Sequence, residues 1–167
     1  IDSLSGRASF DDFSVQFEEL PFTDQEIQDF NRVVVLGMGT SLHAAMVGRN
    51  WFESLARIPT EADNSSEFRY RNPVIDEKTL VISISQSGET ADTLAAMEEA
   101  ARKKTTQITL CNYAGTQTER IADATILIRA GVEIGVASSK TFTCSLTSLY
   151  LLALYIGAKR RTISNDR

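Results

Sequence analysis

Short apolar runs alternate along this chain with segments of helical periodicity. The run from Val33 to Leu36 ends at Gly37. Runs that are apolar throughout are typical of strands buried on both faces of a parallel sheet. Four further strands are predicted over 59–62, 80–85, 107–111 and 124–128, and helices over 41–56, 90–103 and 138–157. This alternation predicts an α/β fold: a three-layer α/β/α sandwich around a five-stranded parallel sheet with the flavodoxin-like strand order 2-1-3-4-5.

Charge and hydropathy exclude several classes of protein. Lys and Arg number 17 against 22 Asp and Glu, which gives a net charge of −5. Such a chain lacks the basic surface of a general nucleic-acid binder and the polybasic face of a membrane-surface protein. The longest apolar stretch, 149–158, is too short to span a bilayer. We therefore expect neither a nucleic-acid nor a membrane partner.

The metal-binding residue types are sparse. His43 is the only histidine, and the two cysteines, Cys111 and Cys144, share no short spacing. This pattern excludes a disulfide scaffold and a Cys/His zinc site, so we expect no metal and no cofactor. Thiols buried as small hydrophobes suit a reducing, cytoplasmic location.

Composition divides the chain into three parts. Residues 1–31 are polar and acidic, and Phe10, Phe13 and Phe17 have helical spacing, which predicts a helix. We interpret 1–31 as a helical N-terminal arm, a linker from a preceding domain, which packs on a domain at 32–161. Residues 162–167 are polar, like the start of another linker. Because the chain opens with Ile rather than Met, we expect it to be a piece of a longer protein.

Two unusual loops follow the first and third predicted strands, over residues 37–41 and 85–90. With the strand order 2-1-3-4-5, these loops face each other at the point where ligands bind in such sheets. Each loop combines hydroxyls with glycine and leads into a helix, whose first N–H groups favour an anion. One such loop alone indicates only turn and cap residues. Two of them together indicate a site for a phosphate attached to a polyhydroxy body.

Two other interpretations start from the same region. Gly37-x-Gly39 begins a dinucleotide-binding fingerprint, with Asp63 as its acidic residue, but Leu42 stands where a third glycine or alanine is needed. NAD or FAD binding is therefore disfavoured. After the fifth strand, Glu133 could act as a base and Lys140 as a phosphate or carbonyl partner. The alternative is a solvated glutamate and a lysine on the first turn of the last helix.

Four segments resemble the SIS (sugar isomerase) domain family. They are GMGTSLHA (37–44), SSEFRYR (65–71), ISQSGETADTLAA (84–96) and EIGVASSKTFT (133–143). The match is close to the first SIS domain of the glucosamine-6-phosphate synthases, the isomerising glutamine–fructose-6-phosphate aminotransferases. The segment GRASFDDFSV (6–15) resembles the region that follows the glutaminase domain in that group.

The resemblance implies binding of a hexose 6-phosphate, either fructose 6-phosphate or glucosamine 6-phosphate. It also implies a parent chain with a glutaminase domain and a second SIS domain, which converts fructose 6-phosphate and glutamine to glucosamine 6-phosphate and glutamate. No catalytic residue carries over to this chain, where Glu133 is the only candidate base. By motif match the substrate-binding residues are Thr40, Ser41, Ser85, Gln86, Ser87, Thr90, Val136 and Ser138. The chain departs from the family pattern at Met38 and Leu42.

Two alternatives to this function stay open: a non-catalytic SIS module that senses a sugar phosphate, and a SIS enzyme that acts on another amino-sugar phosphate. We also expect a homodimer, because the last helix carries more apolar side chains than one small sheet needs to bury. These side chains are Leu146, Leu149, Leu152, Ala153 and Ile156.

Overall fold

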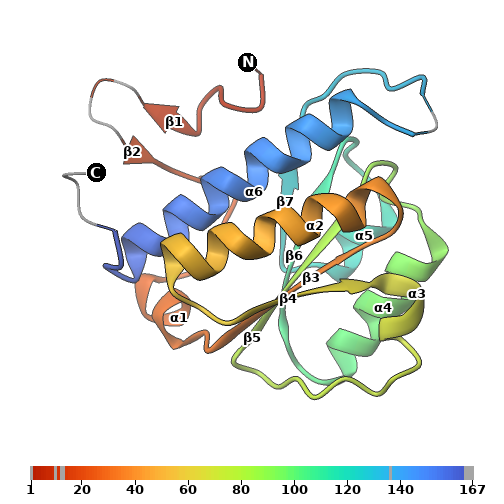
Figure 1. The fold of residues 1–167 in the computed structure, drawn as a ribbon, viewed down its shortest axis with the longest axis horizontal. Helices are drawn as coiled ribbons and strands as arrows, with labels where there is room; N and C mark the ends of the chain where they lie inside the picture. The colour runs from red at the N-terminus through yellow and green to blue at the C-terminus, as the bar shows by residue number, and fades with distance from the viewer. Residues whose placement is uncertain (1, 10, 12–13, 136, 164–167) are drawn as a thin grey trace.

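The computed structural model describes residues 2–9, 11, 14–135 and 137–163. Five strands form one parallel sheet: β3 (Arg32–Gly37), β4 (Thr60–Asn64), β5 (Thr79–Ser85), β6 (Thr106–Cys111) and β7 (Ala124–Leu127). The strand order is β4-β3-β5-β6-β7, as Figure 1 shows. The predicted order 2-1-3-4-5 is therefore confirmed.

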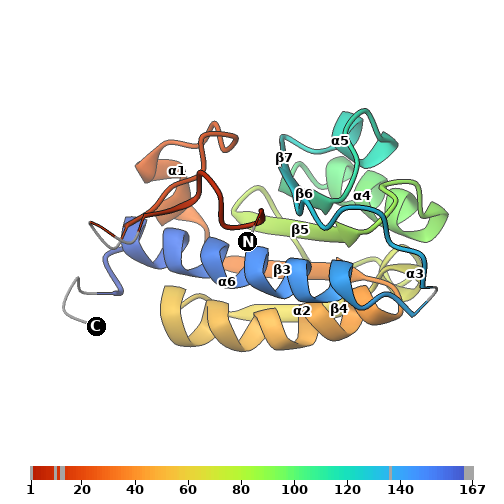
Figure 2. The ribbon, with the colours of Figure 1, turned by 90° about the horizontal axis from the view of Figure 1, so that it is seen from above.

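Helices cover both faces of this sheet (Figure 2). One face carries α2 (Thr40–Trp51), which continues into a π-helical turn (Phe52–Ala56), and α6 (Lys140–Lys159). The other face carries α4 (Ala91–Arg102) and two short helices, α3 (Ser65–Phe68) and α5 (Gln117–Ile121).

Alternate residues of β3 enter two separate clusters. Val33 and Val35 belong to the core cluster under α2 and α6, whereas Val34 and Leu36 pack with Phe68 and the small residues of α4. All four valine and leucine side chains are fully buried. This division between two faces is the reason that the strand is apolar throughout, and it confirms the three-layer architecture.

The N-terminal region differs from the predicted helix. Strands β1 (Ala8–Ser9) and β2 (Ser14–Val15) form a short antiparallel pair instead. Phe10 and Phe13 lie outside the described residues. Phe17 is buried, with its ring centroid 5.5 Å from that of Tyr155 on α6, so it serves a tertiary contact rather than a helical stripe.

A short helix follows in this region. Helix α1 (Asp24–Asp29) has Thr23 as its N-cap, and the Glu26 carboxylate accepts the Thr23 backbone N–H at 2.7 Å to complete a capping box. Both hydrogen bonds to Thr23 hold the pKa of Glu26 below its usual range.

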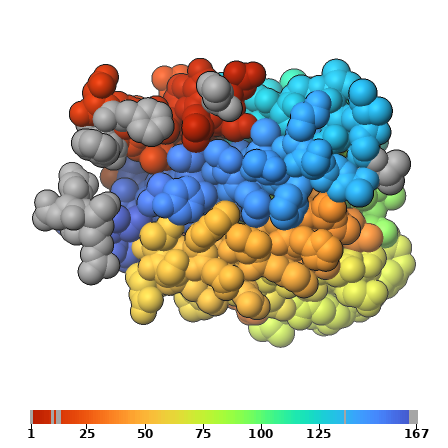
Figure 3. Space-filling model, turned by 45° about the horizontal axis from the view of Figure 1, so that its top comes forward, coloured from red at the N-terminus to blue at the C-terminus, as the bar shows by residue number. Residues whose placement is uncertain are grey.

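The apolar face of α6 is buried within the chain. Figure 3 shows α6 between the N-terminal region and α2. Leu149, Leu152, Ala153 and Ile156 are at most 2% exposed, and Leu146 is partly buried. The expected surplus of apolar surface on this face is therefore wrong, because α2 packs closely on α6: a Cβ added at Gly48 would lie 2.9 Å from Leu149 Cδ1.

Within the described residues, α6 is the one helix long and apolar enough to cross a membrane by length and composition. In its most apolar window, 56% of the residues are buried inside the fold. Packing against α2 and the sheet accounts for the apolar character of this helix.

Candidate functional site

A cavity of about 310 Å³ lies at the carboxyl ends of β3 and β5, where the strand order reverses. Three segments line it: the loop after β3, the loop after β5 and the segment before α6. They supply Met38, Thr40, Ser41, Ile84, Ser85, Gln86, Ser87, Thr90, Thr93, Glu133, Ile134, Gly135 and Ser138. The structure thus brings together seven of the eight predicted binding residues; the eighth, Val136, lies outside the described residues.

Four residues line the cavity without having been predicted to do so: Ile84, Thr93, Ile134 and Gly135. Thr93 is the third residue of α4 and belongs to the ISQSGETADTLAA segment, so its place in the first helical turn could have indicated it. Ile84 is a strand residue, and nothing in its apolar type indicates a ligand.

The first loop turns sharply into α2. A Cβ on Gly37 would lie 2.6 Å from the carbonyl carbon of Ser41, so only glycine fits this close approach. Gly39 is the N-cap, with φ +54°, and no described side chain caps α2. The Thr40 hydroxyl lies 3.0 Å from the Ser138 hydroxyl, which joins the first loop to the third segment.

The second loop presents three hydroxyls around the start of α4. Ser85 Oγ accepts the Gly88 N–H at 3.1 Å and lies 3.1 Å from Thr90 Oγ1. Ser87 Oγ accepts the Glu89 N–H at 3.2 Å, which leaves its own O–H free to donate. No described side chain caps α4. This loop therefore combines hydroxyl donors with an uncapped helix N-terminus, an arrangement that suits an anion.

The third segment contributes a carboxylate with an unexpected partner. Glu133 Oε2 accepts the backbone N–H groups of Ser139, Lys140 and Thr141 at 3.1, 3.0 and 3.1 Å. Led by the Thr141 N–H, these bonds hold the pKa of Glu133 below its usual range. Glu133 is thus not a freely solvated side chain, and these hydrogen bonds favour its charged form.

Lys140, the other charged candidate, does not line this cavity. Its ammonium group donates to the Val132 carbonyl oxygen. Of the described side chains that line the cavity, Glu133 is the only titratable one, and none is a lysine or arginine. Positive potential in the cavity comes from helix N-termini and hydroxyl dipoles instead.

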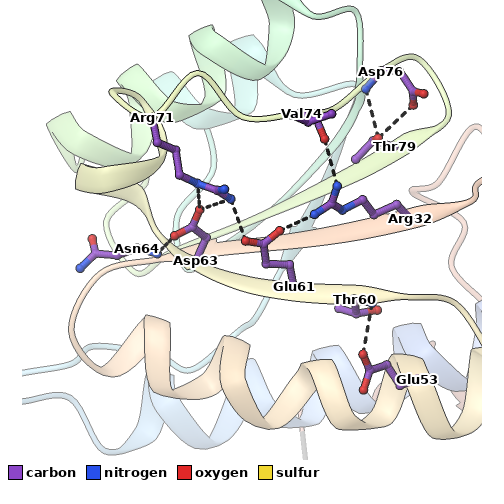
Figure 4. A network of polar contacts seen from close by, with 10 residues as sticks. All are labelled: Arg32, Glu53, Thr60, Glu61, Asp63, Asn64, Arg71, Val74, Asp76 and Thr79. Carbon is purple, nitrogen blue, oxygen red and sulfur yellow. Dashed lines mark hydrogen bonds and ion pairs between the residues drawn. The ribbon is translucent and has the colours of Figure 1, made fainter.

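The SSEFRYR segment follows the edge strand β4, and Figure 4 shows its last residue, Arg71, beside that strand. Arg71 contacts Glu61 and Asp63 at 2.7 Å each, and Arg32 contacts Glu61 at 2.6 Å. These ion pairs hold the end of α3 on β4. They also engage the Asp63 carboxylate, which a dinucleotide site would need for the ribose.

Two cavities of more than 500 Å³ lie elsewhere. One of about 510 Å³ lies between the N-terminal region and the first turn of α6. The other, of about 680 Å³, lies at the amino ends of β5 and β6 and is lined by six charged side chains: Glu26, Asp29, Glu77, Lys78, Lys104 and Asp123. Neither cavity is at the carboxyl ends of β3 and β5, where both hydroxyl-rich loops meet, so the smaller cavity is the candidate site.

Comparison with known proteins agrees with the fold. The chain belongs to the SIS domain family, whose model matches residues 26–155. The expected family is therefore confirmed.

Individual relatives share a name that is more specific than the family. The chain is 43% identical over 166 residues to the isomerising glutamine–fructose-6-phosphate aminotransferase of Caldanaerobacter subterraneus, covering 99% of this chain and 27% of the relative. It is 44% identical to the protein of the same name from Methanosarcina acetivorans, covering 98% of this chain and 26% of the relative. The chain thus spans about a quarter of the length of the curated relatives it matches.

Solved structures include similar folds. The C-terminal domain of glucosamine-fructose-6-phosphate aminotransferase from Francisella tularensis matches with a TM-score of 0.82 and 33% identity, over 86% of this chain and 41% of that chain. Glucosamine-6-phosphate deaminase from Thermotoga maritima matches with a TM-score of 0.71 and 22% identity, over 81% and 46%. The second likeness concerns the fold alone.

Proposed function

We propose that the cavity binds a hexose 6-phosphate, fructose 6-phosphate or glucosamine 6-phosphate. Ser85, Ser87 and Thr90 surround the phosphate, and Thr40 and Gln86 lie beside it. Ser41 and Ser138 contact the sugar hydroxyls, and we propose the same role for Val136 from its motif position. The observation that carries this proposal is the meeting of two hydroxyl-rich loops, each at an uncapped helix N-terminus.

Physical chemistry supports a phosphate in this position. A phosphate dianion accepts many hydrogen bonds, and the N-terminus of a helix favours it by the alignment of the peptide dipoles. The hydrogen bond from the Glu89 N–H to Ser87 Oγ uses an oxygen lone pair, so the Ser87 O–H can still donate to a ligand. A neutral sugar gains none of the charge-assisted part of these contacts.

We infer that the chain is the sugar-phosphate-binding half of an isomerase, part of an enzyme that converts fructose 6-phosphate and glutamine to glucosamine 6-phosphate and glutamate. The identity of 42–44% to proteins named for this activity supports this inference over a non-catalytic sensor. In the same proposal the parent is cytoplasmic, assembles as a homodimer, and carries a glutaminase domain and a second SIS domain.

Calorimetric titration with fructose 6-phosphate and with fructose tests the phosphate assignment. We expect fructose 6-phosphate to bind at least about tenfold more tightly, since charge-assisted hydrogen bonds contribute more than neutral ones. Ser87→Ala weakens binding of the phosphate ester by about tenfold. Ser54→Ala, a matched change outside the cavity, leaves it unaltered. Equal affinities for the two sugars would refute the assignment.

A further inference from the structure

The carboxylate of Glu133 reaches the N-terminus of α6. One oxygen, Oε2, accepts three consecutive backbone N–H groups and lies 3.3 Å from Thr141 Oγ1. Ser139 is the N-cap residue, but no described side chain makes the usual cap hydrogen bond there. Glu133 supplies that cap from six residues earlier in the sequence.

Ser138 directly precedes the three residues whose N–H groups Glu133 accepts. Its N–H donates to the Gly135 carbonyl at 3.1 Å, and its φ is +35°, a region that costs energy for a residue with a side chain. A backbone conformation of this kind persists only where surrounding contacts impose it. In this conformation the Ser138 hydroxyl reaches the Thr40 hydroxyl at 3.0 Å, across the mouth of the candidate cavity.

The same contacts make Glu133 a weaker proton acceptor than a free carboxylate. A general base needs a free lone pair aimed at the substrate and a pKa near the working pH. One carboxylate oxygen, Oε2, accepts the N–H groups of the helix terminus. The hydrogen bond from the Thr141 N–H contributes most to lowering the pKa of Glu133. The acceptor oxygen Oε2 of Glu133 is therefore engaged by the α6 terminus.

We propose that Glu133 is a positioning residue: by capping α6 from within the loop, it holds Ser138 against Thr40 and so shapes the sugar side of the cavity. This inference rests on the proposed function only for the ligand. The arrangement of Thr40, Ser138 and the α6 terminus is a property of the free chain.

The test compares Glu133→Ala, Glu133→Gln and a control of equal charge change, Glu98→Ala, which is exposed on α4. Backbone amide resonances of the free protein, measured by NMR, report on the loop. Titration with fructose 6-phosphate reports on the site. We expect Glu133→Ala to shift the amide resonances of Thr40 and Ser138 and to weaken binding by about tenfold. Glu133→Gln keeps one acceptor oxygen, so we expect its affinity for fructose 6-phosphate to lie within about threefold of that of the unsubstituted chain.

Several outcomes decide the matter. Unchanged Thr40 and Ser138 resonances in Glu133→Ala would overturn the positioning role. An equal loss of affinity for fructose 6-phosphate in Glu133→Gln and Glu133→Ala would also overturn it, because that result indicates a need for the charge rather than for an acceptor oxygen. A third outcome is that Glu133→Ala shifts these resonances while the unsubstituted chain binds no fructose 6-phosphate. That result would support the positioning role and refute the proposed function. Thermal melting of each variant separates these effects from global unfolding.

Discussion

Gly88 is the residue that the second loop can least replace. Its φ is +67°, and a Cβ placed there would lie 2.5 Å from both Cβ and Oγ1 of Thr116, which is itself buried. Gly115 has a similar φ of +78°, but a Cβ there would meet nothing within 4 Å. The two glycines therefore separate the cost of the backbone conformation from the cost of the close approach.

Gly88→Ala is expected to lower the free energy of unfolding by about 3 kcal/mol, since it adds a steric clash to the left-handed backbone. The control Gly115→Ala carries the backbone cost alone, about 1 kcal/mol. Urea denaturation of both variants measures the difference. If Gly88→Ala were no less stable than Gly115→Ala, the approach of Thr116 would not constrain the loop.

At the scale of elements, α5 holds the second loop in place. The Glu89 carboxylate accepts both the backbone N–H and the side-chain Nε2 of Gln117, at 2.8 and 2.7 Å. The Gly88 carbonyl accepts the Thr118 N–H at 3.1 Å. Thus the acidic residue of the SQSGET motif faces the neighbouring helix, and it does not line the cavity.

Glu89→Ala is expected to weaken binding of fructose 6-phosphate by about threefold, because exposed charged hydrogen bonds contribute modestly. Removal of a negative charge also favours an anionic ligand at long range. Glu98→Ala carries the same charge change without a contact to the loop, and calorimetry on both variants isolates the positional effect. Equal affinities in the two variants would contradict a role for α5.

The sequence was most informative about the elements with a clear pattern of apolar residues, either an apolar run or a helical period. All five strands of the main sheet and the helices α2, α4 and α6 lie within a few residues of their predicted bounds. The helix predicted through Phe10, Phe13 and Phe17 was wrong, because spacing alone cannot show that Phe17 packs on the distant Tyr155. Helices α3 and α5 have four and five residues, too short for a periodic signal.

At the scale of the whole molecule, topology explains why the site could be largely predicted. In a parallel sheet, the loops that follow the strands lie at the same edge. Thr40 and Ser87 therefore line the same cavity although they are far apart in the sequence. The role of Glu133 could not be predicted, since its partners are backbone N–H groups that no side-chain pattern reveals. The packing of α2 on the apolar face of α6 could not be predicted either.

The arrangement of the cavity also predicts what this chain does not do. Transfer of a proton between C1 and C2 of a ketose phosphate needs a base and an acid in contact with the sugar. Among the described side chains that line the cavity, Glu133 is the only titratable group, and its carboxylate is held on α6.

We therefore expect the chain by itself to bind fructose 6-phosphate without converting it. Incubation with fructose 6-phosphate and ammonia should yield no glucosamine 6-phosphate above the uncatalysed level. In D₂O, proton NMR should show no deuterium incorporation at C1, which is a more sensitive measure of proton transfer than product formation. Incorporation at C1 that Glu133→Gln abolishes would make Glu133 the base, and would show that this cavity alone performs the isomerisation chemistry.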